Sequence, residues 1–166
     1  MRTLNRKSEK NNQKPFDPFL SREKFNELEK KLKKLKDFSR PKAVEEVKRL
    51  AELGDFSENV EYQLAKGRLR GISQSIIILE NQLKQAVIIA LPKQFKTVQI
   101  GHIVTIEINH KQKIYQILGS SETDPIKGIV SRNSPIGSAL LGRQVGDIIK
   151  IKPMDKEVEY KIIKIQ

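Results

Sequence analysis

Residues 54–62 read Gly-Asp-Phe-Ser-Glu-Asn-Val-Glu-Tyr, and they separate two long stretches with helical apolar spacing. On their C-terminal side, apolar residues recur at alternating steps of three and four: Tyr62, Ala65, Leu69, Ile72, Ile76, Leu79, Leu83 and Ala86. On their N-terminal side the same heptad rule gives Phe25, Leu28, Leu32 and Leu35, and then, after a break, Val44, Val47 and Ala51. Two such seams joined by a short turn bury each other by folding back, so the sequence predicts an antiparallel helical hairpin with residues 54–62 at its tip.

Two features interrupt the predicted arms. In the first arm, Pro41 removes an amide donor and clashes one turn back, so we expect a kink there, with Ser39 as cap of a restarted helix. In the second arm, Gly67 and Gly71 weaken the helix, and we interpret them as marks of close helix–helix approach.

The predicted tip has two readings from its residues alone. In the first, Gly54 ends one helix with a positive φ, Asp55 or Ser57 caps the next, and Glu58 suits the positive end of the helix dipole. In the second, Asp55 and Glu58 lie three residues apart and converge on one face at the end of the rod. Two convergent carboxylates are suitable ligands for Mg²⁺, which keeps several waters and a phosphate as its other ligands.

After Pro92 the period changes from helical to two, which predicts β-strands. The candidate strands are residues 103–108, 114–118, 148–151 and 158–165, with turn signals between them. Residues 134–142 instead predict a turn followed by a short helix that ends at Gly142. We therefore expect an α+β fold of four parts: 1–17 a disordered basic arm, 18–91 the hairpin, 92–97 a linker, and 98–166 a small antiparallel sheet domain with one short helix.

Composition narrows the functional classes. The chain of 166 residues has no cysteine, a net charge of +12 and 37% hydrophobic residues, without an apolar run that could span a bilayer. These properties predict a cytoplasmic protein without a membrane partner, and the charge favours RNA, DNA or an acidic protein surface as partner. His102 and His110 have no zinc-site spacing, and no complete catalytic motif is present.

Three segments together resemble a known family: GDFSENVEYQLAK at residues 54–66, Arg40-Pro41 before it, and NSPIGSALLG at residues 133–142. In this order they are similar to the bacterial transcript cleavage factors GreA and GreB, from about Pro18 to Gln166. The resemblance implies an FKBP-like C-terminal domain that binds RNA polymerase and a hairpin that enters the polymerase secondary channel. There the protein would stimulate the polymerase's own cleavage of backtracked nascent RNA, acting at the RNA 3′ end as a cofactor protein rather than an enzyme.

The resemblance also implies roles for individual residues. Asp55 and Glu58 would be the catalytic pair and would hold a Mg²⁺ ion shared with the polymerase, with no metal bound stably to the free, monomeric protein. The expected supporting residues at the tip are Ser57, Asn59 and Tyr62. The expected RNA-contacting basic residues are Lys48, Arg49, Lys66, Arg68 and Arg70, for which a solvated surface is the alternative. The expected polymerase-binding residues are Asn133, Ser134 and Pro135, for which a turn that caps a helix explains the sequence equally well.

Three other functions stay open at this point. A family member could occupy the channel and inhibit, although both acidic tip residues argue against it. The FKBP-like domain could be a prolyl isomerase or chaperone, but fold alone does not define function and the chain has few aromatic residues for such a pocket. A basic coiled-coil nucleic-acid-binding protein would explain the charge without the tip motif. The sequence leaves the choice between a GreA-like and a GreB-like cleavage specificity open.

Overall fold

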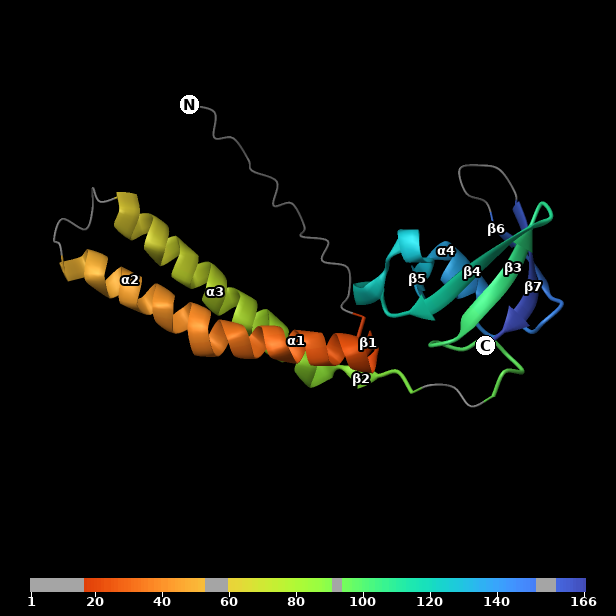
Figure 1. The fold of residues 1–166 in the computed structure, drawn as a ribbon, viewed down its shortest axis with the longest axis horizontal. Coiled ribbons are helices and arrows are strands. Elements are labelled where there is room, and N and C mark those ends of the chain that lie inside the picture. Colours follow the sequence, from red (N-terminus) through yellow and green to blue (C-terminus); the bar gives the residue numbers. More distant parts are fainter. Residues whose placement is uncertain (1–16, 53–59, 91–93, 152–157) are drawn as a thin grey trace, which may run out of the picture.

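The computed structural model describes residues 17–52, 60–90, 94–151 and 158–166. These residues form a long helical hairpin and a sheet domain that follows it in the chain (Figure 1). The predicted α+β fold is therefore confirmed. Within the described ranges, no helix combines the length and the apolar content that crossing a bilayer requires.

The first arm is helical throughout, which corrects the expected restart at Ser39. It consists of α1 (Arg22–Lys34), the π-helix η1 (Leu35–Ser39) and α2 (Arg40–Glu52). Ser39 lies inside the π-helix and caps nothing, and the Arg40 N–H donates to the carbonyl of Leu35, five residues back. The wider turn accommodates Pro41, which has no N–H to offer to an α-helical ladder.

The π-helix also changes which residues of α2 face α3. The sequence spacing predicted Val44, Val47 and Ala51, but Ala43 and Leu50 are the buried residues of α2, at 4% and 3% exposure. A regular heptad continued from Leu35 would reach residues 42, 46 and 49. The π-helix inserts one extra residue, which moves the seam to Ala43, the half-buried Val47 and Leu50.

The second arm is the single helix α3 (Val60–Gln85), whose 26 residues make it about 39 Å long. Its predicted seam is confirmed, because Ala65, Ile76 and Leu79 are buried. The interpretation of Gly67 and Gly71 was wrong: a Cβ built at either position meets nothing within 4 Å.

The hairpin ends earlier than its apolar pattern suggested. The helix stops at Gln85, and β2 (Val87–Ile88) pairs in parallel with β1 (Phe19–Leu20). The β-branched residues at 87–89 favour this extended backbone. The short ladder closes the base of the hairpin next to the sheet domain.

The sheet domain has five strands in the order β5-β4-β3-β7-β6. Four of them match the predicted strands and pair antiparallel: β3 (Ile103–Ile108), β4 (Lys111–Leu118), β6 (Ile148–Ile151) and β7 (Val158–Ile165). Asn109 and His110 both have positive φ and form the tight turn between β3 and β4. The unpredicted strand β5 (Ile129–Ser131) joins β4 in parallel, so the sheet is mostly, not wholly, antiparallel.

The core of this domain lies on one face of the sheet. It contains Val98, Val104, Ile106, Ile117, Leu140, Ile149, Ile162 and Ile165. Leu140 comes from the predicted short helix, α4 (Pro135–Leu140), and is fully buried. Two 3-10 turns, η2 (Ser120–Glu122) and η3 (Pro125–Lys127), precede β5. The segment from β4 to α4 therefore carries both turns and the loop that begins α4.

Candidate functional site

In the sequence, the predicted catalytic tip connects α2 to α3. Asp55, Ser57, Glu58 and Asn59 are outside the described residues, so their side-chain roles stay predictions. The described helices fix where this segment is attached: α2 ends at Glu52 and α3 begins at Val60. Both of those helix ends lie at the end of the hairpin that points away from the sheet domain (Figure 1).

The first turns of α3 bring Tyr62 and Lys66 together. Tyr62 is half-buried at the start of the seam, and the Lys66 ammonium lies 5.8 Å from the centre of its ring. An ammonium at this distance is attracted by the negative face of the ring. The Tyr62 ring therefore packs in the hairpin seam and also positions a basic side chain near the tip.

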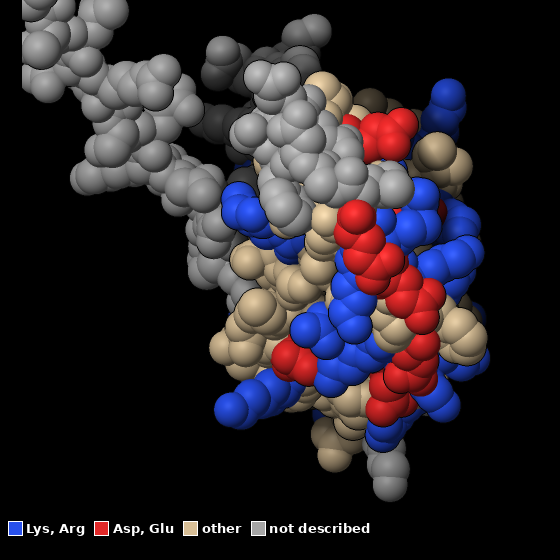
Figure 2. Space-filling model, turned by 90° about the vertical axis from the view of Figure 1, so that its left-hand side faces the viewer, with Lys and Arg blue, Asp and Glu red and all other residues tan. Residues whose placement is uncertain are grey.

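The five predicted RNA-contacting side chains are all exposed but do not share one face. Lys66 and Arg70 are four residues apart and share a face of α3, while Arg68 lies between them on another face. Arg68 is already paired: its Nη1 donates to both carboxylate oxygens of Glu46 on α2, at 2.9 and 2.7 Å. Viewed from the far end of the hairpin, Lys and Arg lie on both sides of a band of Asp and Glu (Figure 2).

The predicted polymerase-binding residues form the loop between β5 and α4. Ser134 is the N-cap of α4: its Oγ accepts from the Gly137 N–H at 3.1 Å and donates to the Ser131 carbonyl at 2.7 Å. Pro135 occupies the first helical position, where its missing N–H costs nothing. The capping explanation of Ser134 and Pro135 is therefore confirmed, whereas Asn133 is exposed and has no capping role.

Asn133 instead contacts a residue that sequence reasoning missed. Its Nδ2 donates to Asp17 Oδ2 and to Ser120 Oγ, each at 3.2 Å. Asp17 was placed at the end of a disordered arm, but it is only 6% exposed. It also accepts from the Ser120 N–H and Ser120 Oγ, both at 2.9 Å, and thereby links the base of the hairpin to the sheet domain.

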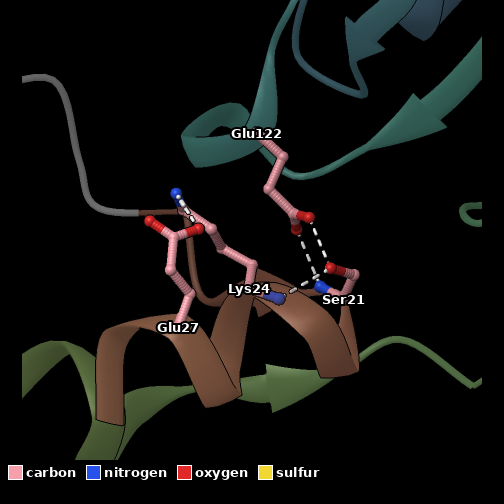
Figure 3. Close-up of polar contacts among 4 residues, drawn as sticks. All are labelled: Ser21, Lys24, Glu27 and Glu122. Carbon is pink, nitrogen blue, oxygen red and sulfur yellow. Dashed lines mark hydrogen bonds and ion pairs between the residues drawn. The ribbon is translucent and has the colours of Figure 1, made fainter. Parts of the chain in front are cut away.

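A second carboxylate, on the sheet domain, makes a link to the hairpin. Glu122 of the sheet domain accepts from the Ser21 N–H at 2.7 Å and from Ser21 Oγ, while Ser21 Oγ accepts from the Lys24 N–H (Figure 3). Glu122 therefore occupies the N-terminus of α1, where the unpaired amides and the helix dipole favour an anion. Beside it, Lys24 donates to Glu27 at 2.9 Å and lowers the pKa of that carboxyl.

Backbone and ring contacts complete this junction between the hairpin and the sheet domain. A Cβ at Gly119 would lie 1.9 Å from the carbonyl oxygen of Phe19, so the two backbones meet here only because residue 119 is glycine. The Arg132 guanidinium lies 4.4 Å from the centre of the Phe19 ring. The partners are about a hundred residues apart in sequence, which is why no local pattern pointed to them.

The described part of the chain offers no metal centre of its own. Across residues 17–52, 60–90, 94–151 and 158–166, no three His, Cys, Asp or Glu side chains gather closely enough to hold a metal ion. His102 is 1% exposed, and its Nδ1 accepts from the Gln99 N–H at 3.0 Å.

The architecture defines a two-part protein in which a long helical hairpin extends away from a compact sheet domain. Two family models match it: "Transcription elongation factor, N-terminal" over residues 19–88 and "Transcription elongation factor, GreA/GreB, C-term" over residues 92–166. Together they cover the hairpin from Phe19 onward and the sheet domain, whereas Asp17 lies outside both matched ranges.

Individual relatives agree with the family models. Transcription elongation factor GreA of Macrococcus caseolyticus is 40% identical over 149 residues, covering 88% of this chain and 94% of the relative. Its counterpart in Staphylococcus carnosus is 39% identical over 158 residues, covering 93% and 98%. The chain belongs to the GreA/GreB family of transcription elongation factors.

Solved structures give a looser match. The crystal structure of GreA factor homolog 1 (Gfh1) of Thermus thermophilus aligns over 90% of this chain and 99% of that chain, at 23% identity and a TM-score of 0.41. A likeness at this level carries no argument about function, so the family assignment rests on the sequence matches.

Proposed function

We propose that this elongation factor acts on RNA polymerase by inserting its hairpin into the secondary channel and stimulating cleavage of backtracked nascent RNA. One observation supports the proposal. In this member of the family, the acidic segment at the start of GDFSENVEYQLAK connects the two helix ends that lie farthest from the sheet domain. A rod about 39 Å long suits a narrow channel that a globular domain cannot enter.

In this proposal the tip supplies only part of a metal site. Asp55 and Glu58 offer two carboxylates, which is too few to hold Mg²⁺ tightly without further ligands. In the polymerase they would share a second Mg²⁺ with the polymerase's own ligands. Two metal ions in such a site stabilise the attacking and the leaving oxygen of phosphodiester hydrolysis. The protein is then a cofactor of the polymerase's nuclease activity and not an enzyme by itself.

The remaining site residues have supporting roles in this proposal. Lys66 and Arg70 share an exposed face of α3 near the tip and are suited to RNA phosphates. Arg68 is held by Glu46 and is less available than the sequence suggested. The loop at Asn133, Ser134 and Pro135 would bind the polymerase outside the channel, where the sheet domain remains.

The test compares transcript cleavage by stalled, backtracked polymerase with wild-type protein and with Asp55→Asn/Glu58→Gln. We expect the double variant to bind polymerase with unchanged affinity and to lose the acceleration of cleavage. Glu61→Gln is the matched control, because Glu61 is an exposed acidic residue in the first turn of α3, and it should retain full activity. If wild-type protein binds and does not accelerate cleavage, the family member is a channel-occupying inhibitor and the proposed chemistry is wrong.

A further inference from the structure

One buried carboxylate organises the exposed loop that begins α4. Asp17 accepts from Phe19 N at 3.3 Å, Ser120 N and Ser120 Oγ at 2.9 Å, and Asn133 Nδ2 at 3.2 Å. The first donor belongs to the hairpin and the other three to the sheet domain. A carboxylate with this many donors is well satisfied without a cationic partner.

The acceptor character of Asp17 determines how Asn133 is oriented. An ionised carboxylate has no hydrogen to donate, so the Asn133 side chain must turn its NH₂ group toward Asp17. Ser120 Oγ, also 3.2 Å from Nδ2, takes part in the same arrangement. The carbonyl Oδ1 of Asn133 therefore lies on the other side of the amide, where among the described residues it receives only a long contact of 3.5 Å from Arg132 Nε.

The serine hydroxyl groups around Asp17 also donate their hydrogen bonds toward it. Ser120 gives its hydroxyl hydrogen to Asp17, so Ser131 must supply the hydrogen in the 2.8 Å contact between Ser131 Oγ and Ser120 Oγ. Ser131 Oγ in turn accepts from the Asn133 N–H at 3.0 Å. The chain of donors runs from the Asn133 backbone through two serines to Asp17, and each link polarises the next.

We propose that Asp17 is a positioning residue, which fixes the Asn133 amide so that Oδ1 is presented outward as an acceptor for a hydrogen-bond donor on the polymerase. The inference rests on the proposed function, because that function places the polymerase against this loop. Ser134 and Pro135 are committed to capping α4. Asn133 and Pro135 are both exposed, but only Asn133 has a polar side chain that can hydrogen-bond to a partner. Asp17 is the reason that this side chain offers an acceptor instead of a donor.

The experiment measures the affinity for RNA polymerase and the rate of transcript cleavage at saturating factor. Asp17→Asn should raise the dissociation constant about tenfold, the effect of losing one orienting hydrogen bond, with the saturating cleavage rate unchanged. Asn133→Ala should weaken binding as much, and adding Asp17→Asn to it should change nothing further. The inference would be overturned if the fold-changes in the dissociation constant of the two single variants multiplied in the double variant. It would also be overturned if Asp17→Asn bound polymerase with wild-type affinity.

Two further variants separate orientation from general loosening of the junction. Glu122→Gln makes the same acid-to-amide change at the other link, which does not touch Asn133, and should leave the affinity within about twofold. An equal loss from Glu122→Gln would assign the effect to the junction and refute the role of Asp17. Asn133→Asp places two carboxylates together and should bind weakly. An Asn133→Asp protein with wild-type affinity also counts against the inference.

The outcomes also distinguish the inference from the proposed function beneath it. Wild-type protein that does not bind polymerase would refute both. Wild-type protein that binds, together with an Asp17→Asn variant that binds equally well, would refute the inference alone. Thermal unfolding of each variant, measured in the full chain, shows whether a loss of affinity has a folding cause.

Discussion

His102 is a buried titratable side chain in the sheet domain. Its ring stacks with Phe95 at a centroid distance of 5.4 Å, Nδ1 accepts from the Gln99 N–H, and Nε2 has no hydrogen-bond partner among the described residues. Burial lowers the pKa of His102 from its ordinary value of 6.5, and the backbone of Gln94 offsets this only in part. The imidazole therefore stays neutral in the folded protein at pH 7.

This lowered pKa predicts a pH-dependent stability. Below about pH 6.5 the unfolded chain takes up a proton at His102 before the folded chain does, so the free energy of unfolding falls as the pH decreases toward the folded pKa. Above that range the contribution is fully present. His102→Asn keeps an acceptor near the Gln99 N–H but does not titrate.

The prediction is checked by urea unfolding of the wild type and of His102→Asn between about pH 7.5 and about pH 5. The comparison isolates His102, because carboxylates and other groups titrate alike in the two proteins. The midpoint of the wild type should fall further than that of His102→Asn. His110→Asn is the control, since His110 is exposed, and should follow the wild type. Parallel pH profiles of the wild type and His102→Asn would show that His102 does not contribute.

At the scale of elements, α3 contains two glycines that its packing does not require. Gly67 and Gly71 are exposed, and a Cβ at either meets no other atom within 4 Å. Glycine in a helix costs up to about 1 kcal/mol relative to alanine. Gly67→Ala and Gly71→Ala should therefore each raise the free energy of unfolding by about that amount, measured by urea denaturation. A loss of stability would mean that these positions contact something in the unbound protein.

The π-helix in the first arm gives a second prediction at this scale. Deleting Phe38, which is 71% exposed, would turn η1 into a regular α-helix and keep Ala43, Val47 and Leu50 on the buried face. It would also leave Pro41 inside an α-helical ladder, so the deletion alone should cost about 3 kcal/mol of stability.

Combining the deletion with Pro41→Ala should recover most of that loss, because the clash and the missing donor are both removed. Pro41→Ala in the full-length chain is the reference variant. Urea denaturation of these three variants and of the wild type gives the coupling between the two changes. If the double variant is no more stable than the deletion alone, the extra residue is needed for packing and not for tolerating the proline.

The helix α3 and the π-helix η1 also show how much of the fold can be predicted from the sequence. Heptad spacing predicted the seam of α3, and alternation predicted four strands, because both patterns are local. The sequence predicted Val44 and Ala51 after a break in the heptads, but the heptad continues through a π-turn with one extra residue and buries Ala43 and Leu50 instead. Apolar spacing does not report this extra residue. The early end of α3 depends on β1, a strand of two residues at the other end of the hairpin. Of the candidate site, the sequence named Asn133 but not Asp17, which lies 116 residues away.

At the scale of the whole molecule, the junction determines whether the hairpin and the sheet domain behave as one body. Asp17 reaches from the hairpin into the sheet domain and Glu122 reaches back to the start of α1. Between them, Gly119 lets the Phe19 backbone approach β4's C-terminal end. Reciprocal links of this kind couple the unfolding of the two parts, so we expect the wild type to unfold in a single calorimetric transition.

Gly119→Ala is the sharpest test of that coupling. Gly119 has a φ of −70°, which alanine adopts without strain, so the substitution acts only through the Cβ that would meet the Phe19 carbonyl oxygen at 1.9 Å. The backbones must separate, both carboxylate links must lengthen, and the calorimetric transition should split in two. Gly142→Ala is the control: it adds backbone strain at a φ of +78° but no contact within 4 Å, and it should lower the transition temperature without dividing it. Two transitions in the wild type, or one undivided transition in Gly119→Ala, would mean that the junction does not transmit stability, and the hairpin's direction would then have to be set by the polymerase itself.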